Sequence, residues 1–274
     1  MTSTWERLRL PAAEPAEPRE LFHENSKTTR YTDMPPEAAV IARMQGMWET
    51  LPYSGRRQLP LPPPLETCQA PLLDTIRRRV SARAMTRTEI ALDALATLLY
   101  AGYGVTRDNA GTAWPRPFRT VPSGGALYPL EIYLHAASVG GLTAGLYHYD
   151  PGKHLLHELL DRDQTDKLAG MLVQPELAWS ASVLFCLTAI PERSCFKYSD
   201  RGYRFLLLEA GHVAQNINLV ATALGLGVLN VGGYLDHEID SWLGIDGVTQ
   251  SAVYLVAVGS RAPDPATGTG EHVH

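Results

Sequence analysis

Cysteine is scarce in this chain, and long apolar runs are missing. The three cysteines Cys68, Cys186 and Cys195 form no C-x-x-C pair, which fits neither a disulfide framework nor a thiolate zinc site. No stretch of about 20 apolar residues occurs, and the N-terminus lacks the apolar core of a secretory signal. These absences predict a cytoplasmic protein in a reducing compartment, without a membrane partner.

An excess of basic residues is also missing. The 274 residues carry a formal net charge of −5, whereas proteins that coat nucleic acid present a basic face, so we expect no nucleic-acid partner. With 45% hydrophobic residues, the chain can bury a sizeable core. We predict an N-terminal extension over 1–65, Pro-rich and partly extended, one folded domain over 66–263, and a flexible tail over 264–274.

Residue spacing predicts an α+β fold with regular structure from about Leu72 onwards. Apolar residues at helical spacing indicate a helix from Ile90 that stops at Gly102 and Gly104, and a long, nearly buried helix from Gly202 to Leu224. Alternating or continuous apolar runs predict the strands, and no regular βαβ alternation connects them. The expected strands are 130–136, a hairpin over 145–160, 180–190, 228–234 and 251–260, with a short helix over 165–172.

Two glycine pairs stand next to predicted strands. Gly124 and Gly125 follow Pro122 and Ser123 in "VPSGGALYPLEIY", and Gly232 and Gly233 end "VLNVGG". Such pairs either supply tight bends or remove side-chain bulk so that backbone N–H groups can approach a flat ligand or an anion. No Walker loop, G-x-S-x-G elbow or G-x-G-x-x-G helix start is present, which disfavours a P-loop, a hydrolase and a Rossmann nicotinamide site.

Basic residues cluster before the first predicted helix. Arg79, Ser81 and Arg83 either form part of a solvated basic face or surround a phosphate with two forked donors and a hydroxyl, and Arg261 is placed to close such a site. Lys197 and Tyr198 precede the long helix. They are either a surface pair, or a base whose ammonium form is disfavoured by the positive helix end.

Other polar residues give no metal site. Glu209, His212 and Asn216 share one stripe of the long helix, but a metal would need more ligands, and a histidine there is more often a satisfied core residue. The histidines of the 145–160 hairpin alternate between faces. We therefore predict no metal.

Several segments together resemble the nitroreductase-like flavoenzymes, and specifically the SagB-type dehydrogenases that oxidise thiazoline and oxazoline rings in peptide natural products. The resemblance rests on "FHENSK", "RVSAR", "VPSGGALYPLEIY", "GLYHYDP", "FKYSDRGYRFLLLEAGHVAQN", "ALGLGVLNVGG" and "YLVAVG", in that order along the chain. It implies a nitroreductase-like fold with a central mixed sheet flanked by helices, an intertwined homodimer, and FMN as the cofactor.

The resemblance also implies roles for the residues singled out above. Arg79, Ser81 and Arg83, helped by Arg261, would hold the phosphate and ribityl chain. Pro122, Ser123, Gly124 and Gly125 would line the flavin ring from the partner subunit, and Gly232 and Gly233 would direct N–H groups to N5. Lys197, assisted by Tyr198, would remove the azoline α-proton while hydride passes to N5, and molecular oxygen would reoxidise the flavin.

The implied substrate is an azoline-containing peptide or carrier-bound intermediate, supplied by a cyclodehydratase or another synthetase partner. Two alternatives remain open: an NAD(P)H-dependent nitro or quinone reductase that uses the same flavin site without Lys197, and a non-catalytic flavin-binding partner of a synthetase complex.

Overall fold

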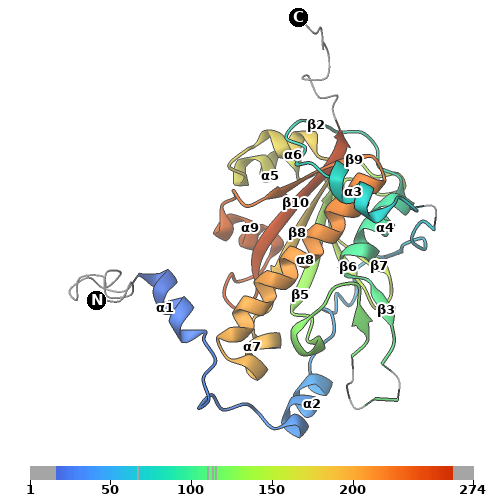
Figure 1. Ribbon diagram of the computed structural model, residues 1–274. Coiled ribbons are helices and arrows are strands. Elements are labelled where there is room, and N and C mark those ends of the chain that lie inside the picture. The colour runs from blue at the N-terminus through green and yellow to red at the C-terminus, as the bar shows by residue number, and fades with distance from the viewer. Residues whose placement is uncertain (1–16, 67, 110, 113, 115, 262–274) are drawn as a thin grey trace, which may run out of the picture.

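An antiparallel sheet forms the centre of the protein, and helices cover both of its faces (Figure 1). The computed structural model describes residues 17–66, 68–109, 111–112, 114 and 116–261. The helices are α1 Pro18–Asn25, α2 Glu37–Gly46, α3 Leu72–Arg78, α4 Leu92–Tyr103, η2 Gly124–Ala126, α5 Thr165–Met171, α6 Glu176–Ser180, α7 Glu192–Tyr198, α8 Arg201–Ala223 and α9 Asp236–Leu243. The strands are β1 Gln58–Pro60, β2 Met85–Thr86, β3 Val105–Arg107, β4 Phe118–Arg119, β5 Leu130–Ala136, β6 Gly145–Asp150, β7 Leu155–Leu160, β8 Val183–Ala189, β9 Leu226–Val231 and β10 Ser251–Arg261.

The main sheet has the order β1-β7-β6-β5-β8-β10-β2. The strand β9 pairs with the edge of β10 that is opposite the edge paired with β8 and β2. Ser260 of β10 shows this branching, because it faces Leu226 of β9 on one side and Thr86 of β2 on the other. The α+β prediction is confirmed. The expected mixed sheet is not what the structure has, since every strand pair in the described sheet is antiparallel.

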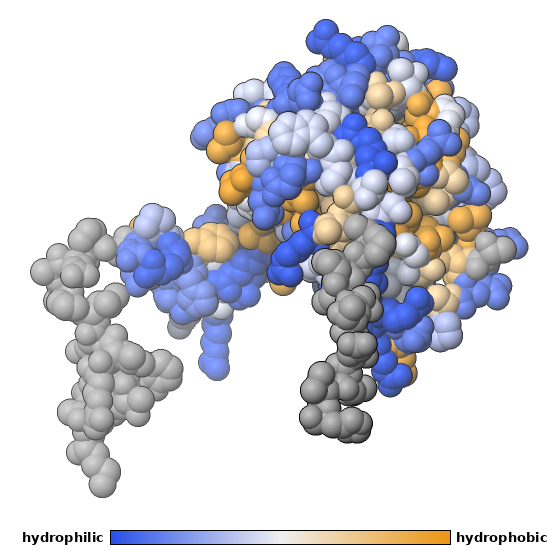
Figure 2. Space-filling view, turned by 90° about the horizontal axis from the view of Figure 1, so that it is seen from above, coloured by the Kyte–Doolittle hydropathy of each residue, from blue (hydrophilic) through white to orange (hydrophobic). Residues whose placement is uncertain are grey.

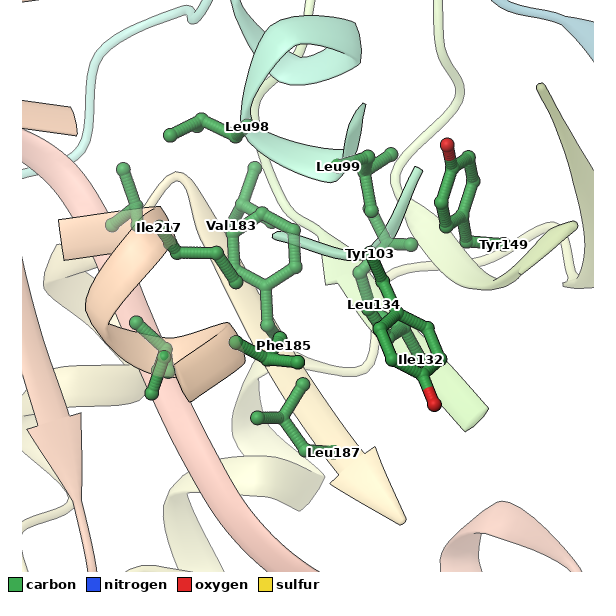
Figure 3. Close-up of a cluster of buried hydrophobic side chains, with 14 of the residues drawn as sticks. Leu98, Leu99, Tyr103, Ile132, Leu134, Tyr149, Val183, Phe185, Leu187 and Ile217 are labelled. Carbon is green, nitrogen blue, oxygen red and sulfur yellow. The ribbon is translucent and has the colours of Figure 1, made fainter. Parts of the chain in front are cut away.

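Two apolar layers sandwich the sheet, because β5, β8 and β10 send alternate side chains to opposite faces. On one face, Phe185 and Ile132 pack against α4 and α8, as Figure 3 shows around Leu98, Tyr103 and Ile217. The other face packs against α5, α6 and α9. Burial on both faces explains why β8 reads as a continuous apolar run rather than an alternating one.

Regular structure begins earlier than the predicted start near Leu72. The helices α1 and α2 lie within the expected extension, and β1 pairs with β7 as an edge strand of the main sheet. Prolines had argued against regular structure here, but an edge strand tolerates proline because one row of its N–H groups needs no partner. The predictions for residues 1–16 and for the tail after Arg261 fall outside the described residues.

The helix α1 stands away from the body of the protein (Figures 1 and 2) and touches it through the start of α8. Phe22 packs edge-on against Tyr203 with ring centroids 5.7 Å apart, and Arg204 donates a 2.7 Å hydrogen bond to Ser26 Oγ.

The long helix α8 is less buried than predicted. Its inner face is covered, but Leu207 and Leu208 on the other side are 42% and 60% exposed. Within the described residues, no helix combines the length and the apolar character needed to cross a membrane.

Candidate functional site

The loop before β5 has an unusual backbone. Gly125, Ala126 and Tyr128 have φ values of 67°, 52° and 48°, and two of the three are not glycine. A non-glycine residue in this left-handed region costs on the order of 1–3 kcal/mol, and such residues concentrate at functional sites. The same strain recurs at Ser199, with φ of 48°, directly after Lys197 and Tyr198.

The glycine pair in this loop permits a close approach of α7 and α8. A Cβ on Gly124 would lie 2.9 Å from a ring carbon of Phe205. A Cβ on Gly125 would lie 2.7 Å from Tyr198 Oη and 2.9 Å from Lys197 Nζ. The structure therefore brings together the predicted flavin loop and the predicted base, although about 70 residues of sequence separate them.

Lys197 lies among aromatic rings. Its Nζ is 4.9 Å from the ring centroid of Trp114 and 5.1 Å from that of Tyr198, and Tyr198 packs edge-on against Phe205 at 5.0 Å. Lys197 is in the last turn of α7, where carbonyl groups favour a cation. The structure therefore places Lys197 at the end of α7, and not only before the start of α8 as the sequence indicated.

A cavity of about 590 Å³ opens in front of Lys197. We call it the Lys197 pocket. Its walls include the expected Pro122, Ser123 and Gly125. They also include Trp114 and Arg119, which the sequence did not single out.

A buried polar cluster supports the loop from behind. The N–H of Tyr128 donates to Ser123 Oγ at 2.9 Å, and the N–H of Arg119 donates to Tyr128 Oη at 3.0 Å. The guanidinium of Arg119 lies over the rings of Tyr103 and Tyr128, 4.3 and 4.9 Å from their centroids. Tyr103 Oη donates to Glu209 Oε1 at 2.7 Å. Burial raises the pKa of Glu209 to about 7, although Ser123, Tyr103 and Arg119 each oppose that shift.

A second buried network holds α7 in place. Both Arg193 Nη1 of α7 and His148 Nε2 lie 2.7 Å from the carboxylate of Glu131, and Thr50 donates to it at 2.9 Å. Burial alone would raise the pKa of Glu131, but Arg193 and His148 lower it to about 2. This ion pair fixes the helix that carries Lys197 to the start of β5.

The basic residues gather at the far end of α8. Arg79 is half-buried, while Ser81 and Arg83 are exposed, and Ala82 between them donates a 2.9 Å backbone hydrogen bond to Val228 of β9. Arg261 at the end of β10 lines a small cavity of about 170 Å³ next to this segment. Arg261 is therefore near the three predicted phosphate ligands, as expected, and the cluster lies along the outer edge of β9.

The second glycine pair follows β9. A Cβ on Gly233 would lie 3.1 Å from Val173 Cβ, and its carbonyl accepts a hydrogen bond from the Val173 N–H, so Gly233 serves close packing. A Cβ on Gly232 would meet no described atom within 4 Å. The space that a side chain at Gly232 would occupy is therefore open.

One chain does not bring the loop and the basic cluster together. Phe205 touches Gly124, and Thr222 lines the cavity beside Arg261. The 17 residue steps from Phe205 to Thr222 span about 25 Å along α8. The glycine pairs are also apart, because β8 and β10 lie between β5 and β9, which places three strand spacings, about 14 Å, between them.

Sequence reasoning missed Trp114, Arg119 and Tyr128, because nothing in their local pattern marks them. It weighed Glu209 only as a metal ligand. The sequence does show that Glu209 is a lone carboxylate on the buried side of an apolar helix. A buried carboxylate has to be protonated or paired, and this could have marked Glu209 as a residue with an unusual environment.

The chain belongs to the nitroreductase family, whose model, described as "Nitroreductase family", matches residues 76–260. It is 39% identical to "Putative nitroreductase MJ1384" of Methanocaldococcus jannaschii over 61% of this chain and 81% of that protein. It is 34% identical to "Microcin B17-processing protein McbC" of Escherichia coli, over 47% of this chain and 49% of McbC. The chain thus spans about half the length of this processing protein.

Solved structures show the same fold. The crystal structure of a putative nitroreductase from Anabaena variabilis superposes with a TM-score of 0.69 at 24% identity, over 92% of this chain and 49% of that one. A chain of the E. coli microcin synthetase McbBCD complex with truncated pro-MccB17 bound superposes with a TM-score of 0.55 at 21% identity, over 95% of this chain and 86% of that one. The nitroreductase-like fold predicted from the sequence is confirmed.

Proposed function

We propose that this protein is an FMN-dependent dehydrogenase that oxidises thiazoline or oxazoline rings to thiazoles or oxazoles during biosynthesis of a peptide natural product. The observation that carries the proposal is the position of Lys197 and Tyr198 against the strained loop at Gly125, with Lys197 lining a cavity large enough for a small ring. A nitro or quinone reductase would have no use for a lysine and a tyrosine held there. The relation to McbC, a peptide-processing protein, supports the same assignment.

The residues present fit FMN in chemical type. The side chains of Arg79, Ser81 and Arg83 suit a phosphate, because two guanidinium groups and a hydroxyl can donate to its oxygens. Gly232, directly after β9, has no described atom within 4 Å of the position of an added Cβ, so a flat ring could approach its backbone there. When bound, FMN would accept a hydride.

A complete site needs two copies of the chain. The phosphate ligands and Gly232 would form one half of the site, and the loop with Lys197 and Tyr198 would form the other. Within one chain, the phosphate ligands lie about 25 Å from that loop along α8, and Gly232 lies about 14 Å from it across the sheet. We propose a homodimer in which each half-site faces the complementary half of the second copy. The exposed Leu207 and Leu208 on the outer face of α8 support an interface along this helix.

The chain's own residues would then act on the substrate as follows. Trp114, Arg119 and Ser123 enclose the azoline in the Lys197 pocket and limit the access of water. Lys197 would take the proton from the ring α-carbon, and FMN would supply the hydride acceptor, so the ring would lose two hydrogens. Tyr198 Oη orients the amine or relays its proton.

The substrate would be an azoline-containing peptide or a carrier-bound intermediate, and molecular oxygen would reoxidise the flavin. A cyclodehydratase or synthetase partner would supply the ring, as McbC's relation to a synthetase complex suggests.

The test is mass spectrometry of an azoline peptide incubated with the FMN-reconstituted protein. We expect a loss of two hydrogens per ring, and none with the Arg79→Met, Arg83→Met double variant, which should also fail to retain FMN. An unaltered peptide with fully loaded wild-type protein would refute the proposal.

The relation to the M. jannaschii protein favours a second candidate, an NAD(P)H-dependent nitro or quinone reductase. Rapid bleaching of the bound flavin by NADPH would support that alternative. A bleached flavin together with unaltered azoline would make it the better assignment, and a non-catalytic flavin protein would show neither reaction.

A further inference from the structure

A buried carboxyl group lies behind the Lys197 pocket, and the proposed chemistry does not use it. Glu209 on the inner face of α8 is 2% exposed, and its Oε1 accepts a hydrogen bond from Tyr103. Its Oε2 is fully buried and has no hydrogen-bond partner among the described residues. A buried carboxyl oxygen without a partner is costly, so this atom calls for a donor or an acceptor beside it.

Ser123 is the side chain in position to provide one. Ser123 precedes Gly124, which contacts Phe205, and Phe205 and Glu209 lie one turn apart on the same side of α8. The Ser123 hydroxyl therefore lies near the carboxyl group, and its effect of lowering the pKa of Glu209 agrees with this placement. The Tyr128 N–H already donates to Ser123 Oγ, and this leaves the hydroxyl hydrogen and one lone pair for other partners. Ser123 also lines the Lys197 pocket. The hydroxyl therefore stands between the buried carboxyl and the pocket.

We propose that Glu209 is a positioning residue that sets the direction of the Ser123 hydroxyl through a hydrogen bond between Glu209 Oε2 and Ser123 Oγ. When the carboxylate is ionised, Ser123 donates to Oε2, and its hydrogen is turned away from the pocket. When the carboxyl is protonated, Oε2–H donates to Ser123 Oγ, and the serine hydrogen is free to point into the pocket as a donor. The proton on Glu209 thus decides whether the loop offers a donor to a bound molecule.

The groups that face Glu209 from neighbouring elements are Tyr103 of α4, Tyr128 of the loop and Arg119 of β4. The two phenols remain neutral, because burial raises the pKa of each. Arg119 favours the carboxylate, but burial outweighs it and raises the pKa of Glu209 to about 7, so both states are populated near neutral pH. The effect on a bound flavin or azoline rests on the proposed function, whereas the hydrogen bond itself does not.

Infrared difference spectra test the hydrogen bond without any cofactor. We expect an acid-minus-alkaline spectrum across about pH 7 to show the carbonyl band of a buried protonated carboxyl. The band should disappear in Glu209→Gln and move to higher wavenumber in Ser123→Ala, which removes the proposed partner. His212→Gln, at an exposed position on the same helix, is the control and should leave the band unchanged. A band that persists in Glu209→Gln, or keeps its wild-type position in Ser123→Ala, would overturn the proposal.

The visible absorbance of bound FMN tests the consequence. After reconstitution, the wild-type spectrum should titrate with a midpoint near pH 7, and this titration should be lost in both Glu209→Gln and Ser123→Ala. An unchanged titration in both variants would overturn the link to the pocket. If no variant and no wild-type protein binds FMN, the proposed cofactor fails while the infrared result still decides the hydrogen bond. If Glu209→Gln does not fold, the band shift in Ser123→Ala decides alone.

Discussion

Ionisation of Glu209 should make the fold less stable as the pH rises to neutrality. The folded protein holds this carboxyl almost fully buried, which raises its pKa from 4.5 to about 7. The folded state therefore binds the proton more tightly than the unfolded state. The stabilisation is complete below about pH 4.5 and is lost as the pH rises through 7. The difference between a pKa of 4.5 and one of about 7 corresponds to roughly 3 kcal/mol of stability.

Glu209→Gln isolates this contribution, because the amide keeps an acceptor for Tyr103 but does not titrate. The free energy of unfolding would be measured by urea denaturation, followed by tryptophan fluorescence, for both proteins without cofactor from pH 5 to pH 8. Other groups with shifted pKa values, including the depressed Glu131 and the buried His135, are common to both proteins and cancel in the difference. We expect wild type minus variant to fall by about 2–3 kcal/mol across this range.

A difference that stays constant within about 0.5 kcal/mol would show that Glu209 does not change its charge on folding in this pH range. It would also mean that the carboxylate finds compensation in the folded protein beyond Tyr103, Ser123 and Arg119. A difference that rises with pH would contradict the sign, and with it the conclusion that burial dominates the environment of Glu209.

Three further predictions concern the loop, the base and the interface. Lys197→Ala should lower azoline oxidation on the order of 10²-fold or more with FMN content and melting temperature retained, and near-normal turnover would exclude Lys197 as the base. Gly125→Ala should lose more thermal stability than Gly55→Ala, since both have positive φ but only at Gly125 would the new Cβ meet other atoms; equal losses would show that Lys197 and Tyr198 simply move aside. Leu208→Asp should yield a monomer without FMN by light scattering and absorbance, and a stable flavin-loaded dimer would place the interface elsewhere.

Local patterns in the sequence were sufficient for the central strands and for the helices α4, α5 and α8. The strand at Leu130–Ala136 was predicted with its observed limits, and the helix at Leu92–Tyr103 ends beside Gly104, as glycine at a helix end suggests. These elements follow from periodicity and turn residues, which depend on near neighbours in the chain. Prolines misled the prediction before Leu72, because whether a strand edge tolerates them depends on which strand lies next to it.

The sequence by itself determined the family resemblance, the α+β class and the residue types of the site, because motifs such as "VPSGG" and "FKYSDRGY" retain their order and chemistry. Only the tertiary structure placed Lys197 against Gly125 and the basic residues at the opposite end of α8. Contacts between residues far apart in sequence depend on how helices pack across the sheet, and local spacing does not encode that packing. The environment of Glu209 has the same origin, since burial and the approach of Tyr103 and Ser123 arise only when α4, α8 and the loop converge.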